Sequence, residues 1–90
     1  MYTGLVVDDI PFNQIALKMM LKHYNIEADS VFDGLQAIEK VKLKMQQNCQ
    51  IYQLIFIDIE MPGMDGFQTS KQILKIIDIK IIYYFYMLCI

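Results

Sequence analysis

Short apolar runs alternate along the chain with longer stretches of helical periodicity, and this alternation restricts the possible folds more than any other feature. The run Leu5-Val6-Val7 is typical of a buried strand, because it is apolar, partly β-branched and too short for a helix. Similar patterns predict strands at 26–32, 52–57 and 79 to about 88, and helices at 11–24, 33–48 and 67–77. Strands that alternate with helices of ten or more residues form right-handed βαβ units. The sequence therefore predicts an α/β fold with a doubly wound parallel sheet of about four strands and three helices.

Each predicted helix carries apolar residues at helical spacing, which is typical of an amphipathic helix with one face on a sheet. These residues are Phe12, Ile15, Ala16, Met19 and Met20 in the first helix, Leu35, Ile38, Val41 and Met45 in the second, and Phe67, Ile73, Leu74 and Ile77 in the third. Pro11 suits the first turn of the first helix, because an N–H there would have no helical partner. We expect Lys40, Lys42 and Lys44 to form a solvated face of the second helix.

Composition and charge exclude several classes of protein. The 90 residues are 56% hydrophobic and 20% charged, which is too apolar for a disordered chain and rich enough for one small packed domain. The formal net charge is −2 and the chain contains no arginine, whereas a nucleic-acid surface needs clustered basic residues. We therefore expect no nucleic-acid partner.

The chain shows no sign of a membrane segment or of an oxidising environment. The apolar run at 81–90 has ten residues, whereas a membrane helix needs about 20, so we interpret the run as part of a strand. The start MYTGLVVDDI lacks the basic region of a signal peptide. Cys49 and Cys89 lie far apart, without the spacing of a redox pair or a zinc site. Two reduced thiols and a cytoplasmic location are the simplest interpretation.

Three aspartates stand at the ends of two predicted strands. Asp8 and Asp9 terminate the first strand, and Asp58 terminates the third. In a doubly wound sheet these strands can be neighbours, and ligands bind outside the carboxyl ends where the strand order reverses. Clustered carboxylates raise one another's pKa, so such a group is unfavourable unless a cation occupies it. The sequence therefore predicts a cation site at this edge of the sheet.

Magnesium would relieve this repulsion, because it keeps several waters and takes one or two carboxylates together with phosphate oxygens. A spare carboxylate can then act as a nucleophile and form an aspartyl phosphate. Asp58 is the better candidate, since it stands alone on a central strand. Successive strand residues point to opposite faces, so Asp8 and Asp9 both reach a metal only if the chain bends between them. We expect one direct and one water-mediated ligand from this pair.

Each of these residues also has a purely structural interpretation. An acidic pair after an apolar run often terminates the strand and caps the following helix. After Asp58, the segment MPGMDG predicts a turn, in which Gly63 permits an unusual backbone conformation and Asp65 caps the third helix. His23 fits an exposed helix end better than a phosphorelay histidine.

Three segments together resemble the receiver domain of two-component phosphorelays: VVDD near the start, DGLQAIE in the middle and DIEMPGMDG after the third strand. The resemblance covers roughly residues 4–75 and implies a flavodoxin-like fold. It implies that Asp58 is phosphorylated by a histidine kinase or histidine phosphotransfer protein. It further implies that magnesium is held by Asp8, Asp9, Asp58 and the backbone carbonyl of Glu60. Such a domain is no enzyme in its own right, although it catalyses its own phosphorylation and dephosphorylation. The Pro-Phe-Asn after the acidic pair resembles receivers fused to hybrid histidine kinases.

The resemblance stops before the end of the family's pattern, which has five strands and five helices. Residues 1–90 are therefore expected to form a receiver domain without its last strand and helices. The family places a hydroxyl residue at the end of strand four and a lysine at the end of strand five. No Ser or Thr follows Ser70, the hydroxyl position falls near Met87 to Cys89, and Lys80 lies at the wrong end of its strand. We expect slow or unswitched phosphorylation, and self-association through the uncovered edge of the C-terminal strand.

Two competing functions remain open. A phosphatase of the haloacid dehalogenase type also begins with an aspartate after an apolar strand. It would need a second aspartate where this chain has Glu60, and a threonine where it has Pro62. The stronger alternative is a degenerate or truncated receiver that serves only protein–protein interaction. Phosphate uptake by Asp58 distinguishes this alternative from a working receiver.

Overall fold

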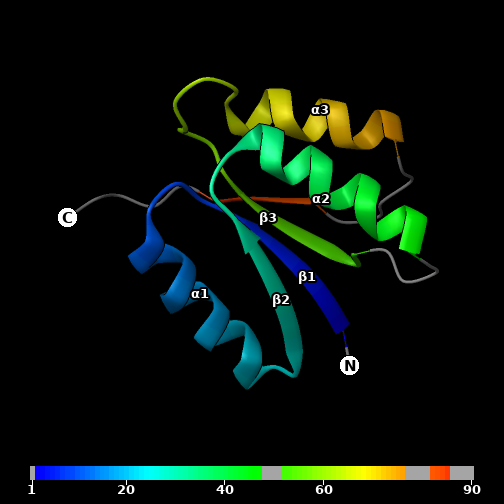
Figure 1. Cartoon of the computed structure of the whole chain (residues 1–90). Helices are drawn as coiled ribbons and strands as arrows, with labels where there is room; N and C mark the ends of the chain where they lie inside the picture. The colour runs from blue at the N-terminus through cyan, green and yellow to red at the C-terminus, as the bar shows by residue number, and fades with distance from the viewer. Residues whose placement is uncertain (1, 48–51, 77–81, 86–90) are drawn as a thin grey trace.

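A parallel sheet with helices on both faces forms the protein, as a computed structural model shows (Figure 1). The structure describes residues 2–47, 52–76 and 82–85. The strands are β1 (Tyr2–Val7), β2 (Ile26–Val31), β3 (Leu54–Asp58) and β4 (Ile82–Phe85), and the helices are α1 (Pro11–His23), α2 (Gly34–Gln47) and α3 (Gly66–Ile76). All strand pairs are parallel, in the order β2-β1-β3-β4. The predicted α/β class and doubly wound sheet are confirmed, with four strands and three helices among the described residues.

The sheet separates two hydrophobic clusters, because successive strand residues point to opposite faces. On one face, Leu5, Val7, Ile55 and Ile57 pack with α2 and α3. On the other face, Val6 packs with two leucines of α1, and Phe56 lies partly buried against them. Leu5, Val6 and Val7 are completely buried, as expected for a central strand that is covered on both faces. Figure 1 shows α1 on one side of the sheet, and α2 and α3 next to each other on the other side.

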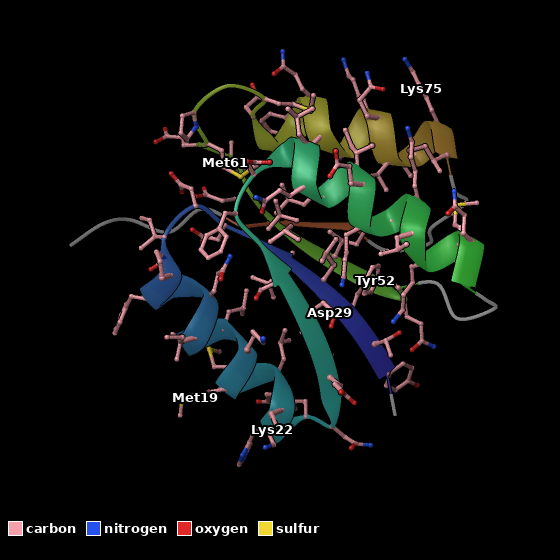
Figure 2. All side chains as sticks on the ribbon, in the orientation of Figure 1. Met19, Lys22, Asp29, Tyr52, Met61 and Lys75 are labelled. Carbon is pink, nitrogen blue, oxygen red and sulfur yellow. The ribbon has the colours of Figure 1, made fainter. Side chains whose placement is uncertain are left out.

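The prediction for the buried face of α1 is wrong. Phe12, Ile15, Met19 and Met20 are exposed, with Phe12 at 74% and Met19 at 69% of their full accessible surface. Figure 2 shows Met19 projecting away from the sheet. The buried face carries Asn13, Gln14, Leu17 and Leu21 instead. Apolar residues occur on both sides of this helix, so their spacing alone does not choose between the faces.

The predicted core residues of α2 and α3 are only partly correct. Val41 and Ile73 are buried and Ile38 is partly buried, whereas Leu35, Met45, Phe67 and Leu74 are exposed, and Ile77 lies outside the described residues. Small residues take the inner positions because the two helices approach closely. A Cβ atom on Gly34 would lie 2.3 Å from Thr69 Oγ1, and Thr69 itself is completely buried. Small residues therefore occupy the contact between α2 and α3, where the pattern predicted bulkier apolar side chains.

The element boundaries differ from the predictions by a few residues. β1 begins at Tyr2, and β3 runs from Leu54 to include Asp58. β4 lies at the sheet edge over Ile82–Phe85, while the remainder of the strand predicted at 79 to about 88 lies outside the described residues. His23 is the last residue of α1, is exposed and packs its ring edge-on against Tyr24, which confirms the helix-end prediction. Within the described ranges, no helix is both long and apolar enough to cross a membrane.

Tyr52, just before the amino end of β3, contacts side chains of both β2 and α2. Its hydroxyl donates a hydrogen bond of 2.5 Å to Asp29 Oδ2 on β2, and Lys44 Nζ of α2 lies 5.3 Å from the centre of the phenol ring. Lys44 also forms an ion pair of 4.0 Å with Asp29, so it is not simply a solvated residue as predicted. Burial, followed by the bond to Asp29, raises the pKa of the Tyr52 hydroxyl. Figure 2 shows Tyr52 and Asp29 beside each other on this part of the sheet.

Candidate functional site

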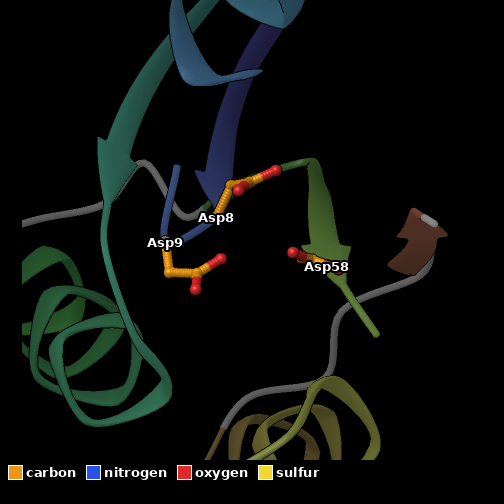
Figure 3. A group of neighbouring side chains, drawn as sticks. All are labelled: Asp8, Asp9 and Asp58. Atoms are coloured by element: carbon orange, nitrogen blue, oxygen red, sulfur yellow. The ribbon is translucent and has the colours of Figure 1, made fainter. Parts of the chain in front are cut away.

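The three predicted aspartates meet at the carboxyl ends of two neighbouring strands. Asp8 and Asp9 directly follow β1, and Asp58 is the last residue of β3, which pairs with β1. One carboxylate oxygen from each residue can be chosen so that the three atoms lie within 4.8 Å of one another. Figure 3 shows the three side chains converging from the two strand ends. The structure thus confirms that the sequence places these carboxylates in one cluster, at the position where α/β sheets bind ligands.

A bend after β1 allows Asp8 and Asp9 to approach the same point. Asp8 Oδ1 accepts a hydrogen bond of 2.9 Å from the N–H of Ile10, which closes a tight turn over the two following residues. The N-cap of α1 is Ile10, which has no side-chain cap. Neither aspartate therefore serves as the N-cap, and the structural alternative of a capping role is not supported.

Two buried amides, which the sequence did not single out, hold this bend. Gln14 Nε2 donates to the carbonyl oxygens of Asp8, at 2.9 Å, and of Val31, at 2.7 Å. The Asn13 side chain favours the ionised Asp8 carboxylate and so opposes the rise in its pKa that burial causes. Both amides lie on the inward face of α1, at 7% and 6% exposure. The available signal in the sequence was a pair of polar residues one helical turn beyond the acidic pair.

The turn after β3 positions Asp58 through main-chain contacts. The N–H of Glu60 donates a hydrogen bond of 3.0 Å to Asp58 Oδ1. Gly63 has a positive φ of 82°, as its place in the predicted turn requires. A Cβ atom on Gly66 would lie 2.5 Å from the carbonyl oxygen of Asp58, so only glycine allows α3 to begin this close to the strand.

Asp65 caps α3 as predicted. Its Oδ1 accepts a hydrogen bond of 2.8 Å from the N–H of Gln68, and Gln68 Oε1 accepts one of 3.1 Å from the N–H of Asp65. This reciprocal pair is a capping box with Asp and Gln in the two positions. It fixes where the helix starts, and hence how the turn lies beside Asp58.

The carboxylate cluster makes ionisation of Asp58 less favourable. Burial, together with the charges of Asp8, Asp9 and Glu60, raises the pKa of Asp58 to about 6, although the bond from the Glu60 N–H opposes this shift. Burial also raises the pKa of Asp8, against the hydrogen bonds from Ile10 and Asn13. None of the described lysines forms an ion pair with these three residues. The cluster therefore carries repulsion that the described part of the chain does not neutralise.

The donor set fits a hard divalent cation. Three carboxylates supply oxygen ligands from one small region, and a cation there would remove the repulsion that raises the pKa of Asp58. Asp8, Asp9 and Asp58 could hold such an ion. The further prediction that the backbone carbonyl of Glu60 completes the ligand set stays a prediction.

The strand register bears on the predicted hydroxyl position. Phe85 of β4 pairs with Asp58 of β3, so the two strands end level with each other. The segment near Met87 to Cys89, where the hydroxyl residue was expected, lies outside the described residues, as does Lys80.

The response regulator receiver domain is the family that matches this chain, over residues 5–84. A curated relative, hybrid signal transduction histidine kinase L of Dictyostelium discoideum, is 45% identical over 69 residues, which are 77% of this chain and 4% of the relative. A variant of the receiver domain of the histidine kinase CKI1 from Arabidopsis thaliana has a TM-score of 0.82 at 24% identity, covering 91% of this chain and 63% of that one. The response regulator protein TrrA from Thermotoga maritima, in complex with Mg(2+)-BeF, has a TM-score of 0.76 at 36% identity, over 92% and 68%.

The chain belongs to the response regulator receiver domain family, the family of signalling modules found in two-component systems and hybrid histidine kinases. It spans only about 4–5% of the length of the first curated relatives, which are hybrid kinases and sensor proteins. The resemblance seen in the sequence motifs is therefore confirmed for the domain itself.

Proposed function

We propose that the chain is a phosphoacceptor domain in which Asp58 takes a phosphoryl group from a phosphohistidine. The observation that carries this proposal is the convergence of three carboxylates at the ends of β1 and β3, the two inner strands of the sheet, with Asp58 alone at the end of β3. Membership of the receiver family supports the same assignment.

Asp58 is the nucleophile in this proposal. Its Oδ1 accepts the hydrogen bond from Glu60 N–H, which holds the carboxylate in place. A new P–O bond forms at Asp58 while the P–N bond of the phosphohistidine breaks, and the departing imidazole takes up a proton. Since the pKa of Asp58 is about 6, the side chain is mostly ionised at neutral pH and ready to react.

Asp8 and Asp9 hold magnesium in this proposal, together with Asp58 and the carbonyl of Glu60. When bound, the ion supplies positive charge that neutralises phosphate oxygens during transfer. The bend at Ile10 keeps Asp8 and Asp9 directed towards Asp58, so the ligands are arranged before the ion arrives. The complex of TrrA with Mg(2+)-BeF supports this choice of metal by similarity.

The proposed phosphodonor is a histidine kinase or a histidine phosphotransfer protein, and the proposed setting is the cytoplasm, as part of a kinase or as a separate regulator. The chain is not proposed to act on any other substrate.

Intact mass measurement tests the proposal directly. The chain is incubated with magnesium and acetyl phosphate, beside Asp58→Asn and a matched control, Asp33→Asn, which alters an aspartate on the β2–α2 loop. We expect one phosphoryl increment in the wild type and in the control, and none in Asp58→Asn. A folded wild-type chain that gains no phosphate would contradict the proposal.

A pure interaction module is the second candidate, and the position of β4 favours it. β4 is an edge strand, so one side of its backbone has no strand partner among the described residues. Free strand edges pair readily with other chains. Light scattering over a range of concentrations measures such self-association; a monodisperse monomer that accepts phosphate would exclude this candidate.

A further inference from the structure

The inward face of α1 has an unusual composition beside the acidic site. Asn13 and Gln14 are buried there, while Phe12, Ile15, Met19 and Met20 of the same helix are exposed. Burying an amide is unfavourable unless its polar atoms find partners. The two amides therefore need a structural or functional reason for their positions.

The hydrogen bonds of Gln14 connect three elements at the edge where the aspartates meet. From the first turn of α1, its Nε2 reaches the carbonyl of Asp8 after β1 and the carbonyl of Val31 at the end of β2. The Val31 carbonyl also accepts a bond of 3.2 Å from the N–H of Asp8. One side chain thus fixes the main chain of Asp8 against the neighbouring strand.

Asn13 acts on the same residue through its side chain. Burial raises the pKa of the Asp8 carboxyl and the Asn13 side chain opposes this shift, so it interacts favourably with the ionised carboxylate, while the N–H of Ile10 bonds Asp8 Oδ1. Gln14 thus holds the main chain of Asp8, and the adjacent Asn13 favours the charged form of its carboxylate. This double support fixes the bend that brings Asp9 to the same side as Asp8.

We propose that Asn13 and Gln14 are positioning residues for the metal ligands, and that they set the affinity and selectivity for magnesium by holding Asp8 and Asp9 in the bend. This inference rests on the proposed function. Replacing a residue that hydrogen-bonds a metal ligand, without itself touching the metal, typically changes metal affinity 10–100-fold. Magnesium demands near-ideal octahedral geometry, whereas calcium accepts more ligands at longer and more variable distances. A loosened bend should therefore weaken magnesium binding more than calcium binding.

Calorimetric titration with magnesium and with calcium tests this inference in the wild type, Gln14→Leu and Asn13→Ala. The matched control is Gln36→Leu, because Gln36 also supports a helix start, and its hydrogen bonds join it to Phe32 and Asp33 rather than to Asp8, Asp9 or Asp58. We expect about a tenfold loss of magnesium affinity in both test variants, a smaller loss for calcium and no change in the control. The changed ratio of the two affinities separates positioning from a general loss of stability, which would weaken both metals equally.

Circular dichroism and urea unfolding in EDTA accompany each titration. Magnesium affinities within twofold of wild type, in variants that are folded, would overturn the inference. Where Gln14→Leu does not fold, Asn13→Ala decides by the same criterion. Loss of folding in both variants, without recovery at saturating magnesium, would also contradict it, because the pair would then hold the fold rather than the site. Failure of the wild type itself to bind magnesium would instead contradict the proposed function.

Discussion

Carboxylates near the two ends of the sheet differ in whether neighbouring residues compensate their negative charge. Towards the amino end of β3, Asp29 of β2 accepts a hydrogen bond from Tyr52 and pairs with Lys44, so its charge has a donor and a cation. At the carboxyl end, Asp8, Asp9 and Asp58 lie together, and no described lysine pairs with them. The contacts of Asp29 stabilise the folded chain directly, whereas the repulsion between the three clustered carboxylates would need a bound cation to neutralise it. Among the described residues, the carboxyl end of the sheet is therefore where a bound cation would relieve repulsion between carboxylates.

Metal binding should neutralise the uncompensated carboxylates at the carboxyl end of the sheet, and we expect it to have the largest effect on stability. A ligand present at a hundred times its dissociation constant stabilises the folded state by about 2.7 kcal/mol. We expect magnesium to raise the free energy of unfolding by about that amount in the wild type and by much less in Asp9→Asn, which removes one charge of the cluster. Urea unfolding with and without magnesium measures both values. An equal response in Asp9→Asn and the wild type would show that the ion binds elsewhere.

Neutralising Asp58 in the absence of metal should stabilise the protein, contrary to the usual effect of removing a buried polar group. The pKa of Asp58 is raised to about 6 in the folded state, above its value of about 4 in an unfolded chain. The associated stability is present below pH 4 and is lost as the pH rises through 6. We expect Asp58→Asn to gain on the order of 2 kcal/mol at pH 7 in EDTA, and its unfolding free energy to vary less with pH between 4 and 6. Unfolding curves across this pH range test the sign, and a less stable Asp58→Asn at pH 7 would refute it.

At the other end of the sheet, loss of a polar group should have the ordinary, destabilising sign. Tyr52→Phe removes the hydroxyl that binds Asp29 but keeps the buried ring. Hydrogen bonds to charged groups contribute about 1.5–3 kcal/mol, and solvent at the partly exposed Asp29 reduces this, so we expect a loss of about 1–2 kcal/mol. Tyr24→Phe, on an exposed ring, is the control and should change the unfolding free energy by less than about 0.5 kcal/mol. If both substitutions change the unfolding free energy equally, the hydrogen bond from Tyr52 to Asp29 does not contribute the expected stability.

The smallest effect is expected from Lys44. Its ion pair with Asp29 is 4.0 Å long and partly exposed, and such pairs contribute little in water. Its position over the Tyr52 ring adds a similar amount at a partly exposed site. We expect Lys44→Met, which keeps the packing of the stem, to cost about 0.5 kcal/mol and the cost to fall in high salt. A loss as large as that of Tyr52→Phe would mean that the ion pair, rather than the phenol, dominates this end.

The sequence predicted the fold and the acidic cluster well, because both depend on local patterns. Strand ends are visible where an apolar run stops at a charged residue, as at Asp8 and Asp58, and parallel topology then brings such ends together. The buried faces of the helices could not be predicted equally well. Gln14 is buried because its amide bonds main-chain carbonyls of two other elements, and no pattern within α1 reveals those partners. The contact of Tyr52 with Asp29 likewise depends on residues 23 positions apart.

The glycine at the start of α3 has a consequence for how substitutions around the site should be interpreted. Gly66 contributes no functional group, yet any side chain there would collide with the main chain of Asp58. A collision of main-chain atoms cannot be relieved by rotating a flexible side chain, so α3 or the strand end would have to move. Position 66 is therefore as intolerant of replacement as a residue that performs chemistry. Loss of function on replacing Gly66 would therefore report a displaced Asp58 and not a missing reacting group.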